Sequence, residues 1–122
     1  MSNNRPWDFD QARDACRKAA HAQENAEEGV RHAAQALAVA EESYRVALAK
    51  RIVELRADGT AATVCADLAR GDAAVAELRR VRDIADGVYE AFKQASWRHN
   101  QNRKDAQRFA DWSMRRELAE AA

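Results

Sequence analysis

The feature that most constrains this chain is a break near its middle, between two long segments that contain no proline. The break covers residues 58–72, which we call the tip, and Gly59 and Gly71 stand near its two ends. The segments on either side are rich in Ala, Glu, Arg and Leu, the composition of long helices. Two long helices joined by a short connection are expected to lie antiparallel. The sequence therefore predicts an all-α fold, a long coiled-coil-like helical hairpin with a short helix at the tip.

The boundaries of the predicted elements follow from residues that start or stop helices. Asp8 followed by Gln11 has the spacing of a capping box. Gly59 suits the left-handed position after a helix, while Thr60 and Asp72 are predicted to cap the helices that follow them. We expect a single domain over residues 1–122, with a loose lead-in over 1–7, a helix over 8–57, a short helix over 61–70 and a second long helix over 73–118.

Apolar residues recur every three or four positions in both long segments, as on one face of an amphipathic helix. The first stripe is Val30, Ala33, Leu37, Ala40, Tyr44, Leu48, Ile52 and Leu55. The second stripe is Val75, Leu78, Val81, Ala85, Val88, Phe92 and Ala95. Several of these residues are alanine, so the predicted core is thin, and a thin core favours packing against a second copy of the chain.

A fold about Cys65 brings two aromatic residues of the long segments close together. It places Tyr44 near the level of Tyr89. We expect a protein interface along the hairpin, with a homodimer as the simplest assembly. The residues predicted for it are Tyr44, Leu48, Tyr89 and Phe92.

Basic and aromatic residues alternate in the last quarter of the chain. The residues predicted for nucleic-acid binding are Trp97, Arg98, Arg103, Lys104, Arg108, Trp112 and Arg115. Charges that follow phosphates and rings that stack on bases are typical of surfaces for single-stranded nucleic acid. The alternative is internal pairing, in which these charges meet Glu24, Glu27 and Glu28 across the hairpin while the rings pack against Trp7 and Phe9. The net charge of zero argues against a general nucleic-acid binder.

The sequence shows no arrangement that predicts catalysis, a metal site or a cofactor. We find no nucleophile beside a base and no glycine-rich phosphate loop, so we expect a protein that is not an enzyme. His21 and His32 are too far apart along one helix to share a metal, and Cys16 and Cys65 fall at opposite ends of the predicted hairpin. A long apolar run and a signal-peptide pattern are both absent, so we expect a cytoplasmic protein with no membrane partner.

The central third of the chain resembles small helical proteins encoded by tailed phages and prophages, which tend to lie among early, DNA-metabolism genes. The segments that carry the resemblance are residues 44–50, 55–63, 67–72, 75–78 and 82–89. The resemblance implies a phage or prophage origin and the cytoplasm of the host cell, and it brings no known activity or binding residue.

The function predicted from these observations is that of a non-catalytic helical adaptor or modulator that binds another protein. Within the phage setting, that partner would be a replication or recombination protein, or a host protein. Two alternatives stay open. One is an accessory protein for single-stranded nucleic acid that uses residues 97–116, and the other is a structural oligomer.

Overall fold

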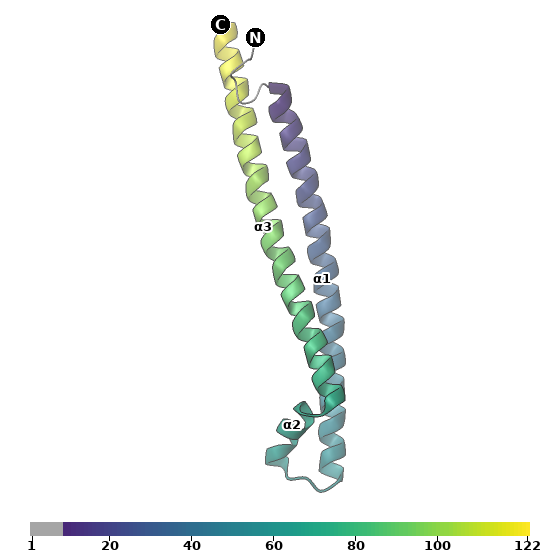
Figure 1. Ribbon diagram of the computed structural model, residues 1–122. Helices are drawn as coiled ribbons and strands as arrows, with labels where there is room; N and C mark the ends of the chain where they lie inside the picture. Colours follow the sequence, from purple (N-terminus) through teal and green to yellow (C-terminus); the bar gives the residue numbers. More distant parts are fainter. Residues whose placement is uncertain (1–8) are drawn as a thin grey trace. The chain divides into compact units, whose positions relative to one another are not determined.

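The structure is a computed structural model that describes residues 9–122, with side chains from Asp10 onward. It contains three helices, α1 (Phe9–Ala57), α2 (Ala62–Arg70) and α3 (Ala73–Ala121), and no strand within the described residues (Figure 1). The long helices pack together and α2 lies at the tip, so the predicted all-α hairpin is confirmed. The predicted cap Asp8 and the ring of Trp7 lie outside the described residues.

Two compact units make up the chain. The described part of unit 1 consists of residues 9–30 of α1 and Phe92–Ala122, and unit 2 consists of Arg31–Ala91, including all of α2. In each unit α1 and α3 run antiparallel and side by side (Figure 1). None of the helices in residues 9–122 has a stretch long and apolar enough to cross a bilayer.

The end of α1 is closed by the glycine that the sequence predicted for it. Gly59 has a φ of 89°, the left-handed conformation that side chains disfavour. Its N–H donates to the carbonyl of Arg56 at 3.1 Å, and the N–H of Thr60 donates to the carbonyl of Leu55 at 3.0 Å. These two bonds form a Schellman motif. Thr60 is therefore part of the end of α1, and its predicted role as the cap of α2 is wrong: Ala61 is the N-cap, with no side-chain bond.

Asp72 caps α3, as predicted. Its Oδ2 accepts a hydrogen bond from the N–H of Val75 at 3.4 Å, which satisfies one of the free donors in the first turn. Its Oδ1 also lies 3.4 Å from Nε of Arg51 on α1. The first turn of α3 therefore lies opposite Arg51.

The position of α2 corrects the predicted register of unit 2. Because α2 lies beside the last turns of α1, α3 begins opposite Arg51 and not opposite the end of α1 (Figure 1). The guanidinium of Arg82 consequently lies 4.6 Å from the centre of the Tyr44 ring. Tyr89 instead lines a groove with Leu37, so the prediction that Tyr44 and Tyr89 lie at one level is wrong.

The core of unit 2 follows the first predicted stripe closely and the second one only in part. Tyr44 and Val75 are buried, at 6% and 3% exposure. Val81 and Val88 of the second stripe are exposed, at 42% and 45%, and Arg82 lies inward in their place. Inward positions of paired helices recur every seven residues, as from Val75 to Arg82, so the residue after each of these two valines faces α1.

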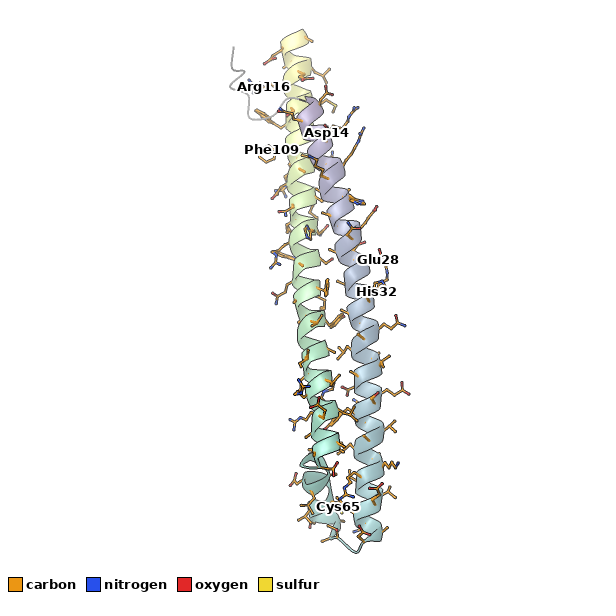
Figure 2. All side chains as sticks on the ribbon, turned by 45° about the vertical axis from the view of Figure 1, so that its right-hand side comes forward. Asp14, Glu28, His32, Cys65, Phe109 and Arg116 are labelled. Carbon is orange, nitrogen blue, oxygen red and sulfur yellow. The ribbon has the colours of Figure 1, made fainter. Side chains whose placement is uncertain are left out.

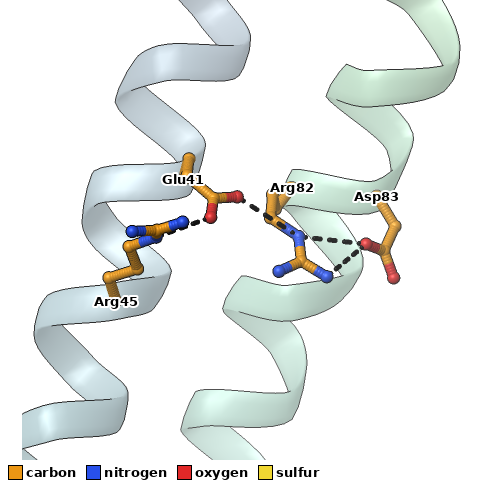
Figure 3. A network of polar contacts seen from close by, with 4 residues as sticks. All are labelled: Glu41, Arg45, Arg82 and Asp83. Atoms are coloured by element: carbon orange, nitrogen blue, oxygen red, sulfur yellow. Dashed lines mark hydrogen bonds and ion pairs between the residues drawn. The ribbon is translucent and has the colours of Figure 1, made fainter.

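An inward arginine is tolerated here because two carboxylates, those of Glu41 and Asp83, lie against its charged group. Nε of Arg82 lies 3.5 Å from Glu41, and Nη2 lies 2.7 Å from Asp83 (Figure 3). Arg45 pairs with Glu41 at 2.7 Å, which extends the network along α1. The hydrogen bond to Asp83 raises the pKa of Arg82, so this side chain stays charged while its stem covers Tyr44.

Candidate interaction surface of unit 1

Five of the predicted binding residues lie along one side of α3 in unit 1. They are separated by steps of seven, four, four and three residues, which keep them on one side of a helix. All five are exposed, whereas Ala106 and Ser113, on the opposite side of the same helix, are buried. We call this set the outer strip: Trp97, Lys104, Arg108, Trp112 and Arg115.

The two tryptophans of the outer strip are unusually open to solvent. Trp97 is 64% exposed and Trp112 is 48% exposed. A groove of about 580 Å³ lies beside Trp112 and is also lined by Phe109 and Arg108. In Figure 2 the ring of Phe109 projects from α3 on the side away from α1. The strip and the neighbouring Phe109 therefore present aromatic and apolar area that stays exposed among the described residues of unit 1.

The charges of the outer strip are only partly compensated nearby. Nη1 of Arg108 lies 3.7 Å from Asp105. Arg116, which borders the strip, stacks on Trp112 at 5.2 Å and pairs with Glu120 at 3.3 Å. With Lys104 and Arg115 added, cations outnumber carboxylates on this side of α3. The strip combines positive charge with exposed aromatic rings.

The remaining two predicted residues do not belong to the outer strip. Nε of Arg103 donates to Oε1 of Gln23 at 2.6 Å, so this side chain turns toward α1. Arg98 lines a separate shallow groove with Trp97. The predicted internal pairing of this arm with acidic residues is thus replaced, at Arg103, by a bond to a neutral amide. Phe9, the other ring predicted to pack here, has no described side chain.

The residues predicted for a protein interface are divided between the units. Tyr44, Leu48 and Tyr89 belong to unit 2 and Phe92 belongs to unit 1. Tyr44 is 6% exposed and lies under Arg82, so it contributes to the core and presents almost no area to a partner. Leu48 and Tyr89 are half-buried, and Phe92 is 41% exposed.

Metal ligands and free thiols are the remaining groups to consider among the described residues. Among them, no cluster of three or more His, Cys, Asp or Glu side chains has the arrangement of a metal site. Cys16 and Cys65 are free thiols that lie in different units. The exposed rings and cations of α3 are therefore the candidate binding groups of unit 1.

Comparison with known proteins assigns no relative: no protein-family model, no curated protein and no solved structure matches this chain. The fold and the surface therefore define only a class. The chain is an all-α helical hairpin with an exposed basic and aromatic strip on one of its long helices.

Proposed function

We propose that this chain is a non-catalytic helical adaptor that binds another protein through the outer strip of unit 1. The observation that carries the proposal is the exposure of Trp97 and Trp112, at 64% and 48%, on the solvent side of α3. Burying a large apolar side chain completely stabilises by about 1.5–3 kcal/mol, and both rings lack a large part of that stabilisation in the free chain. Tryptophan and arginine are also the residue types that contribute most at protein interfaces.

The charges of the strip indicate the chemistry of the partner. Lys104, Arg108 and Arg115 would face a surface that is acidic around an apolar pocket for a tryptophan ring. Complementary charge of this kind raises the association rate more than the affinity. Within the phage setting that the central sequence predicts, a replication or recombination protein, or a host protein, is the expected partner.

Single-stranded nucleic acid is the second candidate for the same strip. The observation that favours it is the order of the side chains, in which cations alternate with ring faces along one side of α3. Two observations weigh against it. The net charge of the chain is zero, and the strip is one side of a single helix, whereas known surfaces of this kind track the strand in a groove.

The test begins with capture of proteins from host-cell lysate by the full chain, followed by titration calorimetry with each captured protein after purification. We expect Trp97→Ala and Trp112→Ala each to weaken the interaction at least about tenfold, the effect of an interface hot spot. The matched control is Leu68→Ala, which removes an exposed apolar side chain from α2 in unit 2 and should leave the affinity unchanged.

A thymidine oligonucleotide titrated at low and at moderate salt separates the two candidates. Adaptor binding predicts little response to the oligonucleotide. Affinity that falls steeply with salt and is lost in Lys104→Ala/Arg108→Ala would favour the second candidate. A purified partner that binds the tryptophan variants as tightly as the original chain would refute a role for the outer strip.

A further inference from the structure

A second exposed surface lies on unit 2, and the proposed function does not use it. It consists of large aliphatic side chains from α1 and α3 that remain between 42% and 68% exposed. We call this set the valine face: Val39, Val46, Val53, Val81, Ile84 and Val88.

The spacing and the groove between the helices place these residues on one side of unit 2. Val39, Val46 and Val53 follow one another at intervals of seven residues, so they lie along one side of α1. Val39 and Val81 line the same groove of about 490 Å³, whose other lining residues are His32, Gln35, Ala36, Ala40, Ser43 and Leu78. Val88 follows Val81 at the same interval of seven on α3. Apart from His32, the lining of this groove is uncharged at any pH.

The opposite side of unit 2 is charged. Its groove is lined by Glu41, Arg45, Arg82, Asp83 and Asp86 together with apolar residues. Four of these side chains form the ion-pair network that links α1 to α3 (Figure 3). Unit 2 therefore has a side whose charges satisfy one another and a side whose apolar groups have no cover. That asymmetry is typical of one layer in a two-layer helical structure.

We propose that the valine face packs against the valine face of a second copy, which gives a two-fold homodimer with four helices around a shared core. This inference goes beyond the proposed function and uses a different surface. The face fits itself because it is mainly apolar. Its exposed cation, Lys50 between Val46 and Val53, can keep its charge in water at the edge of such an interface while its stem covers apolar area. In a two-fold interface the same patch serves both copies.

The exposed area of the valine face supports a second copy of the chain as its partner. From their exposed fractions, the six side chains offer roughly 500 Å² per copy, so two copies that cover them completely bury about 1,000 Å², the lower limit for a specific interface. Unit 2 also needs the additional core. Of its buried apolar residues, Ala33, Ala40, Cys65 and Ala69 are small, and only Tyr44 and Val75 are larger.

The test measures the mass of the full chain by sedimentation and light scattering across micromolar concentrations. We expect twice the 13.7 kDa of one chain. Val46→Lys should raise the dissociation constant of the dimer about 100-fold, because each dimer would bury two unpaired charges. Val88→Lys on α3 should reproduce this effect. Val46 is 61% exposed in one chain, so the substitution leaves the fold of the monomer intact, which far-ultraviolet circular dichroism verifies.

The matched control is Ala38→Lys, an exposed residue of α1 that lines the charged groove on the other side. It should leave the dimer unchanged. A monomeric original chain, or a dimer that Val46→Lys and Ala38→Lys weaken equally, would overturn the proposal. Dissociation by Trp112→Ala alone would also overturn it, since the contact would then lie on unit 1. Loss of partner binding in Trp112→Ala with the dimer intact concerns the outer strip only and leaves the valine face supported.

Discussion

The ring of Phe92 on α3 lies against Gly29 on α1, so close that a Cβ added at position 29 would fall 2.7 Å from both Cδ1 and Cε1 of the ring. Both residues belong to unit 1. Glycine inside a helix costs about 1 kcal/mol relative to alanine, and here the missing side chain makes room for the ring. Gly87 lies in the interior of α3, and a Cβ added there would have no atom within 4 Å.

This difference predicts opposite outcomes for the two alanine substitutions. Gly87→Ala should raise the free energy of unfolding by about 1 kcal/mol, the helix-propensity gain. Gly29→Ala should cancel that gain or reverse it, because the Phe92 ring must move. Urea unfolding of both variants measures the difference. Gly29→Ala in a Phe92→Ala background should recover the gain, and equal gains in the original background would contradict the contact.

Arg82 should couple to Glu41 across unit 2. Their separation is 3.5 Å and the Arg82 side chain is 24% exposed, so a double-mutant cycle with alanine should give a coupling energy of about 0.5–1 kcal/mol. Arg82→Ala should cost more in total than this coupling, because it also uncovers the ring of Tyr44. Arg79→Ala, an exposed neighbour, should change stability by less than about 0.5 kcal/mol. A coupling energy of zero would show that the ion pair between Arg82 and Glu41 does not contribute to stability.

Asp72 should stabilise unit 2 mainly as a helix cap. Asp72→Ala is expected to lower the free energy of unfolding by about 1 kcal/mol, because the N–H of Val75 loses its acceptor. Asp72→Asn keeps an acceptor oxygen and loses only the charge that faces Arg51, so its cost should be less than half as large. Thermal unfolding of the two variants separates the roles. An asparagine variant as unstable as the alanine variant would mean that the ion pair dominates.

The Glu77 carboxylate should titrate at a lower pH than an ordinary glutamate. A hydrogen bond from Arg80, at 2.9 Å, lowers the pKa of Glu77. A folded-state pKa below the unfolded value means that the pair contributes stability above the ordinary pKa of roughly 4.3, and that this contribution is lost as the pH falls through the lower folded value. Carboxyl chemical shifts followed by NMR measure it.

Arg80→Ala should therefore raise the pKa of Glu77 toward the ordinary value. Arg79→Ala removes a neighbouring cation on the same helix and serves as the control, with no expected change. The same Glu77 titration in both variants would show that the hydrogen bond is not maintained in solution.

The limits of the helices could be predicted because they depend on local chemistry. Gly59 ends α1 through its own positive φ, and Asp72 starts α3 through a bond to a residue three positions away. The inward side of α3 could not be predicted in the same way. Hydrophobicity favours Val81 over Arg82, but the seven-residue repeat shared by two packed helices turns Arg82 inward.

The candidate site was predictable in its residue types and less so in its geometry. The pattern of basic and aromatic residues identified all five residues of the outer strip, together with two that do not belong to it. Only the packing of α1 against α3 shows that Arg103 turns to Gln23 and leaves the strip. The valine face was not predicted, although Val39, Val46 and Val53 follow one another at intervals of seven residues. The prediction assigned one apolar stripe to each long helix, and these three valines form a second row on α1.

The placement of α2 beside the end of α1 has a consequence for how the sequence of such a hairpin can evolve. The length of α2 sets the register of the two long helices, because it determines which turn of α1 lies opposite the first turn of α3. Deleting it by joining Gly59 directly to Asp72 would let α3 slide along α1 and would carry Arg82 away from Tyr44. A deletion confined to the connection would thus shift the register between α1 and α3 without altering a residue in either helix.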